Sequence, residues 1–212
     1  GTMTATAPMS TKRAQTQDRL MDAATALFAE KGVLAASVEE ICERAGFTRG
    51  AFYSNFESKD ELLLAVVQRK REAILKAATD AIDSIPDEPI EPQTLDEIIK
   101  QALLIFQATH PIDEQWLLAR SEIRLHALRN PSVRQAVRLV DSSLDELLIE
   151  AIQAVVDRHG VVMTVPPGQL VILLTAYQEA LATSAMLTGE NSFEPLIAER
   201  SAQLIRALLR IS

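Results

Sequence analysis

Apolar residues recur at helical spacing along nearly the whole chain, beginning at Leu20. Positions i, i+3, i+4, i+7 and i+8 of the first segment lie on one helical face, and they are occupied by Leu20, Ala23, Ala24, Leu27 and Phe28. Gly32 suits the left-handed residue that commonly ends a helix. We therefore predict a first helix over residues 15–31, preceded by a loose arm that carries Lys12 and Arg13.

Further helix starts and ends are predicted from capping residues, prolines and glycines. At three places a hydroxyl residue stands three positions before a glutamate, which is the pattern of a capping box: Ser37 and Glu40, Ser58 and Glu61, Thr94 and Glu97. The remaining predicted helices are 37–45, 48–55, 58–83, 94–109, 113–129, 132–159, 168–188 and 193–210. No convincing strand is predicted, because the apolar run 161–165 is short and ends at two prolines. The expected fold class is all-α, with about nine helices.

Residues 37–56 have the pattern of two short helices joined by a tight turn. Gly46 can take the backbone conformation of that turn, and Phe47 can pack into the gap behind it. Phe52 and Phe56 lie one helical turn apart, so we expect both rings to pack on the first two helices. The opposite face would then point outward, as in a helix that enters the major groove of DNA.

The outward face carries side chains that suit contacts with DNA. Arg49 can donate two hydrogen bonds to guanine or pair with a phosphate, and both roles stay open. Gly50 keeps the helix slim, and the hydroxyl of Tyr53 can reach a phosphate. Lys59 lies in the first turn of the next helix, where free backbone N–H groups also favour anions. The full set of predicted DNA contacts is Ser37, Thr48, Arg49, Gly50, Tyr53, Ser54, Asn55 and Lys59.

The first helix contains RLMDAATALFAEKG, and residues 37–63 are SVEEICERAGFTRGAFYSNFESKDELL. Together these stretches resemble the N-terminal domain of the TetR family of bacterial transcriptional regulators. The resemblance implies groove contacts by Thr48, Arg49 and Gly50. It also implies phosphate contacts by Tyr53 and Lys59.

The same resemblance implies a division of the chain into two domains. It implies a helix-turn-helix DNA-binding domain over 12–57 and a larger C-terminal helical domain for ligand binding and dimerisation over 58–212. Asn55 stands where many family members carry histidine, although asparagine can also bond a phosphate. The resemblance does not identify a class of ligand.

Charge and composition narrow the function further. The net charge is −8; residues 10–60 hold 7 basic and 8 acidic side chains, whereas residues 61–212 hold 14 and 21. A general polyanion binder should be basic throughout, so DNA binding here must rest on a few well-placed cations. No apolar run approaches the roughly 20 residues of a membrane span, and Cys42 is the only cysteine. We expect a cytoplasmic protein without a membrane partner.

Signatures of catalysis are missing from the sequence. It contains no glycine-rich phosphate loop, no GxSxG motif, no metal-ligand cluster and no convincing nucleophile–base pair. Glu122 and His126 lie one helical turn apart, but their spacing differs from that of di-iron bundles. We therefore expect neither an enzyme nor a cofactor or metal.

The last two predicted helices, 168–188 and 193–210, are apolar on more than one face. A helix of this kind needs more than one neighbour. Two copies of a helix-turn-helix protein bind half-sites related by a two-fold axis, so something must hold the copies together. We predict a homodimer through an isologous interface made by these two helices of each subunit.

The middle helices contain aromatic residues and a few polar groups, which is the usual lining of a small-molecule site. The candidate lining residues are Phe106, Trp116, Arg120, Glu122, His126 and Tyr177. The predicted function is a dimeric repressor that binds a palindromic operator in double-stranded DNA and is released by a small-molecule effector. A transcriptional activator, or a helical ligand-binding protein without a DNA role, is the alternative.

Overall fold

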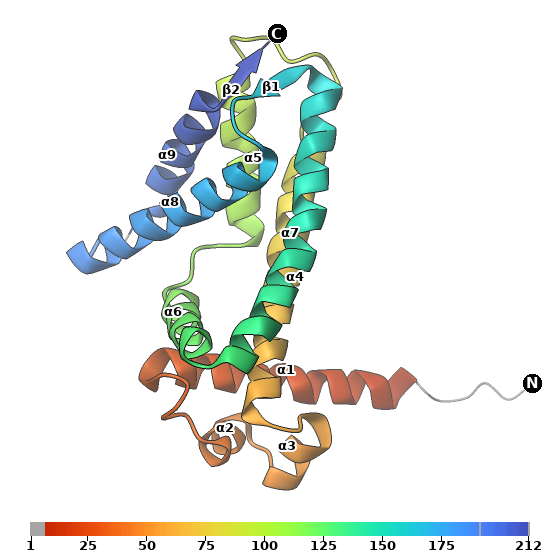
Figure 1. Ribbon diagram of the computed structural model, residues 1–212, viewed down its shortest axis with the longest axis vertical. Coiled ribbons are helices and arrows are strands. Elements are labelled where there is room, and N and C mark those ends of the chain that lie inside the picture. Colours follow the sequence, from red (N-terminus) through yellow and green to blue (C-terminus); the bar gives the residue numbers. More distant parts are fainter. Residues whose placement is uncertain (1–6, 191, 212) are drawn as a thin grey trace, which may run out of the picture. The chain divides into compact units, whose positions relative to one another are not determined.

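The computed structural model describes residues 7–190 and 192–211, with side chains from residue 11 onward (Figure 1). The elements are, in order, α1 (Ala7–Lys31), α2 (Val38–Ala45), α3 (Arg49–Asn55), α4 (Lys59–Asp83), α5 (Leu95–Thr109), α6 (Glu114–Arg129), α7 (Pro131–His159), β1 (Val161–Met163), α8 (Pro167–Thr188), α9 (Glu194–Ala207) and β2 (Leu209–Ile211). Within the described residues, the prediction of an all-α fold with about nine helices is confirmed.

The start of α1 differs from its prediction. The helix begins at Ala7, so Lys12 and Arg13 belong to it, and the prediction of a loose arm was wrong. This early segment lacks apolar periodicity, but it also contains no residue that stops a helix after the first turn. Residue 191, within the predicted break at 189–192, lies outside the described residues.

The two strands were not predicted. Val161–Met163 pairs antiparallel with Leu209–Ile211, so the last helix ends at Ala207 and the expected helix to residue 210 was wrong. The partner strands are far apart in the sequence, and a three-residue strand carries too little periodicity to be predicted by itself.

One of the three capping boxes was also wrong. The hydroxyls of Ser37 and Ser58 accept from the backbone N–H of Glu40 and Glu61, both at 3.1 Å, as expected. Thr94 instead has helical backbone angles, and its hydroxyl donates to the carbonyl of residue 91 at 3.0 Å. A turn that precedes α5 therefore occupies the hydroxyl that the capping box required.

Packing divides the chain into two compact units, each described here by itself. The first consists of Gly1–Lys70 and Asp113–Val140, and the second of Arg71–Ile112 and Asp141–Ser212. Helices α4 and α7 each contribute one part to either unit. The N-terminal helices thus pack with α6, which is distant in the sequence. The predicted boundary after residue 57 separates a DNA-binding domain from a ligand-binding domain by function, and it stays a prediction.

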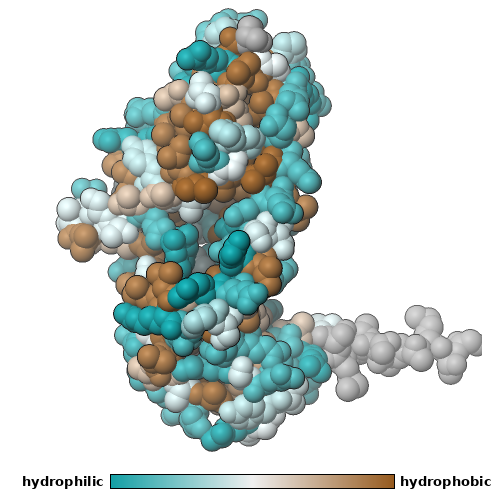
Figure 2. Space-filling model, viewed as in Figure 1, coloured by the Kyte–Doolittle hydropathy of each residue, from teal (hydrophilic) through white to brown (hydrophobic). Residues whose placement is uncertain are grey.

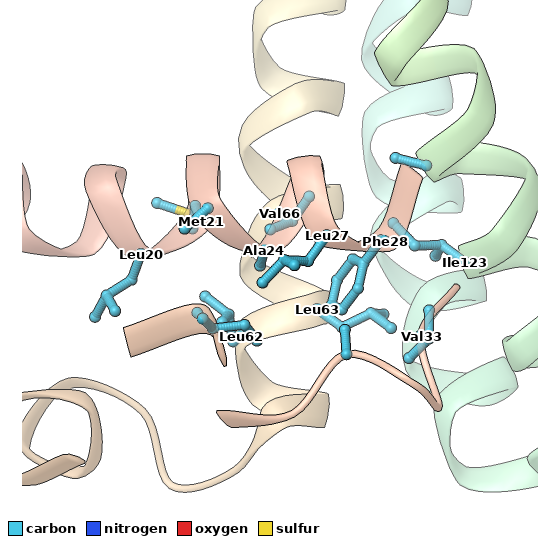
Figure 3. Packing of buried hydrophobic residues seen from close by; sticks show 14 of the residues in the cluster. Leu20, Met21, Ala24, Leu27, Phe28, Val33, Leu62, Leu63, Val66 and Ile123 are labelled. Atoms are coloured by element: carbon cyan, nitrogen blue, oxygen red, sulfur yellow. The ribbon is translucent and has the colours of Figure 1, made fainter. Parts of the chain in front are cut away.

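The first unit has a continuous apolar core. Leu20 and Phe28 of α1 are fully buried, as is Phe52 of α3. Figure 3 shows how α1, the start of α4 and α6 supply side chains to the same cluster, with Leu63 and Ile123 among them. Burial of a large apolar side chain contributes about 1.5–3 kcal/mol. This core holds α2 and α3 at the surface of the unit.

The second unit packs α5 and α8 against α9, around a smaller cluster of Leu95, Ile99, Leu103 and Ala202. Apolar residues also gather on its surface, as Figure 2 shows for one face of the molecule. The most exposed of those on α8 are Ile172 at 68% and Leu187 at 83%. Helix α8 therefore covers only part of its apolar surface within one chain.

By length and composition, α8 is apolar enough to cross a membrane. The expectation that no segment of the chain is long and apolar enough for a span was wrong by that criterion. Only 17% of the most apolar part of α8 is buried within the chain. A single helix of this kind is weak evidence for a membrane span, since a helix that packs on a second protein surface has the same composition.

Candidate DNA-binding surface and ligand cavity

The turn between α2 and α3 is held by backbone and side-chain hydrogen bonds. Gly46 has φ 77°, the left-handed conformation that favours glycine, and the N–H of Phe47 donates to the carbonyl of Cys42 at 2.9 Å. Arg19 of α1 donates to the carbonyl of Ala45 at 2.8 Å, and its guanidinium lies 4.7 Å from the centre of the Phe47 ring. Arg19 therefore fixes the turn from behind, a role that the sequence pattern did not reveal.

Ion pairs clamp α2 onto α1. Lys31 pairs with Glu40 at 2.6 Å, and Arg44 donates to both carboxylate oxygens of Glu30 at 2.5 and 2.9 Å. The hydrogen bond from Arg44 lowers the pKa of the Glu30 carboxyl. Two of the acidic side chains near the N-terminus are thus neutralised by local partners.

Helix α3 is amphipathic, as predicted. The hydroxyl of Thr48 caps it by accepting from the N–H of Ala51 at 3.2 Å. Phe52 and Phe56 are buried, with ring centres 6.0 Å apart. Tyr53 lies on the other side, 47% exposed, with its ring edge-on to Phe52. The aromatic core thus orients the opposite face of α3 toward solvent.

That exposed face centres on Arg49, whose side chain is 61% exposed. Its Nη1 lies 2.5 Å from Oε1 of Glu39 on α2, and its guanidinium lies 5.6 Å from the centre of the Tyr53 ring. At Gly50, an added Cβ would meet only Thr48 Oγ1, at an ordinary 3.7 Å. No contact within the described chain therefore requires glycine at position 50. Close approach of another molecule to this face would be a reason for glycine there.

The other predicted DNA contacts lie around α3 and already have partners. Ser54 donates to the carbonyl of Ala51 at 2.9 Å, and Asn55 donates to the same carbonyl at 2.8 Å. Ser37 is engaged as the cap of α2. Arg13, which the sequence placed in a loose arm, donates to the carbonyl of Ser54 at 3.4 Å.

Lys59 is a structural tie as well as a candidate phosphate contact. Its Nζ donates to the carbonyls of Val33 and Ala36 at 2.7 and 2.9 Å, in the loop between α1 and α2. Burial lowers the pKa of the Lys59 ammonium, and neighbouring Asp60 opposes the shift. An ammonium has three donors, so one remains for a phosphate.

The second unit encloses a cavity of about 260 Å³. It is lined mainly by aliphatic side chains of α4, α5, α7 and α8, together with residues of β1, α9 and β2. Among the six predicted ligand contacts, Phe106 is the one that lines it. Tyr177 lies half-buried on α8 and does not line it.

The other four predicted ligand contacts lie on α6 in the first unit: Trp116, Arg120, Glu122 and His126. The ammonium of Lys70 lies 5.1 Å from the centre of the Trp116 ring. His126 is buried, with Nε2 3.4 Å from the carboxylate of Asp60. The candidate ligand contacts predicted from the sequence were aromatic and polar residues. The cavity is instead lined mainly by aliphatic residues, which cannot be told from other buried residues by sequence.

Comparison with known proteins identifies the helix-turn-helix segment. Residues 20–66 match the model for "Bacterial regulatory proteins, tetR family". The chain is also 32% identical over 105 residues to the uncharacterised HTH-type transcriptional regulator YwcC of Bacillus subtilis, a match that spans 50% of this chain and 47% of YwcC. The chain thus carries the helix-turn-helix segment of TetR-family transcriptional regulators, as the resemblance implied, and its match spans about half the length of YwcC.

The likeness to TetR-family regulators extends beyond the helix-turn-helix. The HTH-type transcriptional regulator SrpR of Pseudomonas putida is 24% identical over 204 residues, which cover 85% of this chain and 95% of SrpR. The crystal structure of a proposed TetR-family regulator from Mesorhizobium loti superposes with a TM-score of 0.70 at 22% identity. That match covers 94% of this chain and 98% of the other, and it shows a shared fold.

Proposed function

We propose that this TetR-family regulator is a repressor that binds a near-palindromic operator as a dimer and is released when a small molecule binds. The observation that carries the proposal is the double role of α4. Leu62 and Leu63 in its first turns belong to the core that supports α3, and Ile74 and Ala78 in its later turns line the cavity. One continuous helix thus belongs to both the DNA-binding core and the candidate effector site.

In this proposal α3 is the recognition helix. Arg49 donates to a guanine edge or a phosphate, while Thr48 and Gly50 allow close approach to the groove. Tyr53, Ser54 and the remaining donor of Lys59 contact phosphates on either side, as do Ser37 and Asn55. The support for these roles is the exposure of Arg49 and Tyr53 on the face opposite the buried Phe52.

Dimerisation through α8 and α9 is supported by uncovered apolar surface. Ile172, Leu173 and Leu187 on α8 and Leu196 on α9 are each at least 39% exposed. Two copies that share this surface would remove it from water, with a gain of about 25 cal/mol per Å². A two-fold axis would then place two recognition helices on one operator.

Release by an effector requires coupling between the two sites. A ligand in the cavity would favour one arrangement of α4, and the arrangement that binds DNA would become less populated. Such couplings are typically about 1–3 kcal/mol, which corresponds to a change in DNA affinity of about 5–150-fold.

The direct test is selection of bound fragments from the source genome, followed by footprinting of the recovered sites. The proposal predicts protected sites with two-fold symmetry, and an affinity that falls with salt as phosphate contacts release counterions. Recovery of only asymmetric sites bound by single copies would contradict the dimeric operator. Transcription from the same promoter with and without the protein separates repression from activation, because an activator would raise it.

The dimer is tested with the double variant Ile172→Glu/Leu187→Glu, analysed by sedimentation. We expect monomers that bind single half-sites weakly. Leu128→Glu on α6 is the matched control, since Leu128 is 63% exposed and lies outside α8 and α9. Dimers in the double variant would exclude α8 as the interface, and monomers in the control would show that the loss of dimers is not specific to α8.

A further inference from the structure

The cavity of the second unit has an unusually uniform lining. Isoleucine, leucine, valine and alanine side chains make up most of it, with Phe106 as its aromatic residue. No Asp, Glu, Lys or Arg is among the described residues that line it, and its polar side chains are His159, Thr175 and Gln178. This lining favours hydrocarbon, because each apolar group that enters the cavity leaves water.

A charged group inside such a cavity would have no counter-ion. Transfer of an ionised carboxylate or ammonium into apolar surroundings is costly unless the charge is paired and hydrogen-bonded. The cavity offers no carboxylate, ammonium or guanidinium for that purpose among its described lining residues. The lining therefore favours a ligand whose buried part is uncharged.

His159 is a polar lining residue whose buried ring nitrogens lack partners. It is the last residue of α7, next to the glycine that leads into β1. Both of its ring nitrogens are buried, and no described group hydrogen-bonds to either. The amide nitrogen of Gln178, in contrast, donates to the buried hydroxyl of Ser201 at 3.1 Å.

A neutral imidazole has one N–H donor and one acceptor nitrogen. A hydroxyl can pair with either nitrogen, and a carbonyl oxygen can accept from the N–H. Buried polar atoms without partners are unfavourable, so a ligand that brings one oxygen to this ring removes a cost as well as adding a contact.

We propose that the cavity binds an uncharged, mainly hydrocarbon molecule whose single hydroxyl or carbonyl oxygen hydrogen-bonds to His159. The volume of about 260 Å³ is many times the ~10–15 Å³ that a single water needs. The cavity therefore has room for a hydrocarbon chain, and compounds with eight to ten carbons serve as probes. That the ligand is the effector rests on the proposed function, whereas its binding to the cavity can be measured without DNA.

The first experiment compares four probes by calorimetry on the full-length protein: 1-octanol, 2-octanone, octanoate and octylammonium. We expect the alcohol and the ketone to bind, and both ions to bind at least about tenfold more weakly. Equal or tighter binding of either ion would overturn the assignment of ligand class. Absence of binding by all four up to about 1 mM would overturn the cavity as a site for such molecules.

The second experiment tests His159 with the variant His159→Leu and with butylbenzene, a probe of similar size that has no oxygen. We expect affinity for 1-octanol to fall about tenfold, while butylbenzene binds at least as well as to the wild type. An equal loss for both probes would show that His159 only shapes the cavity, which would overturn its hydrogen-bonding role.

The location is tested by filling the cavity with Ala102→Phe on α5, with Ala108→Phe as the matched control. Ala102 lines the cavity, whereas Ala108 is exposed on the same helix. We expect the first variant to lose all probe binding and the second to keep it. If Ala102→Phe fails to fold, Ala78→Leu on α4 replaces it, since Ala78 also lines the cavity. Unchanged binding in a folded, filled variant would place the ligand elsewhere.

DNA measurements then separate the two proposals. If 1-octanol binds in the cavity but leaves operator affinity unchanged, the ligand class stands and its role as effector fails. If operator binding is dimeric and specific but no probe binds, the ligand inference fails and the DNA-binding role stands.

Discussion

Glu39→Gln tests how Arg49 is used in DNA binding. In the free protein, Nη1 of Arg49 lies 2.5 Å from the Glu39 carboxylate. A base edge or a phosphate would compete with Glu39 for the same guanidinium. The neutral amide of glutamine keeps the shape of the side chain but removes the charge. We therefore expect the variant to bind its operator more tightly than the wild type.

The magnitude follows from the exposure of the pair. The two side chains are 61% and 56% exposed, and ion pairs at such exposure contribute about 0.2–1 kcal/mol. A dimer would give up two of them, about 0.4–2 kcal/mol in total, if both are lost on binding. At tenfold per 1.4 kcal/mol, the affinity of Glu39→Gln should rise about twofold to 30-fold.

The assay is fluorescence anisotropy with a labelled operator fragment, carried out as a double-mutant cycle with Arg49→Ala. Part of the gain comes from removing a negative charge near phosphates, and that part persists without Arg49. The part that comes from the ion pair should vanish in the Arg49→Ala background, and it should shrink as salt screens the pair. An equal effect of Glu39→Gln in both backgrounds, or weaker binding, would refute competition for Arg49.

Three further outcomes are expected. Arg49→Ala should relax the sequence preference at one base pair per half-site, with a loss of about 1–3 kcal/mol of binding free energy at that base pair. Affinities for operator variants measure this loss. An equal loss of affinity for all sequences would mean that Arg49 contacts a phosphate instead. Lys59→Met removes the donor to the carbonyls of Val33 and Ala36. The free energy of unfolding should therefore fall by about 1–3 kcal/mol in urea titrations, and binding to all DNA sequences should weaken. Unchanged stability would show that these hydrogen bonds contribute little. Burial lowers the pKa of Lys70 in the folded state, with Asp113 opposing the shift. The unfolded chain therefore binds more protons between that lowered pKa and about 10.5, and wild-type stability should rise with pH through this window relative to Lys70→Met; parallel pH profiles would contradict it.

The helices were predictable because each is encoded locally. Helix α3, for example, follows from a capping hydroxyl at Thr48 and a pair of aromatic residues one turn apart. The same local pattern predicted that Tyr53 would be exposed and Phe52 buried. What a residue does within its own helix is thus largely set by its near neighbours in the sequence.

Contacts between distant segments could not be predicted in this way. The pairing of Glu39 with Arg49 depends on the angle between two helices, and Arg19 reaches the turn at Ala45 from a third. Helix α6 was assigned to a ligand site because it carries Trp116 and His126, but it packs in the first unit. The cavity escaped notice because aliphatic lining residues have the same pattern as any buried helical face.

The discontinuity of the first unit has a consequence for protein engineering. Ala119, Ile123, Ala127 and Val133, from α6 and the start of α7, are buried in the same core as Leu20 and Phe28. A fragment that stops at residue 57 or 70 would leave the α6-facing side of α1 in water. Chimeras that exchange DNA specificity between such regulators should therefore carry residues 113–140 along with the helix-turn-helix, or redesign the surface of α1 that these residues cover.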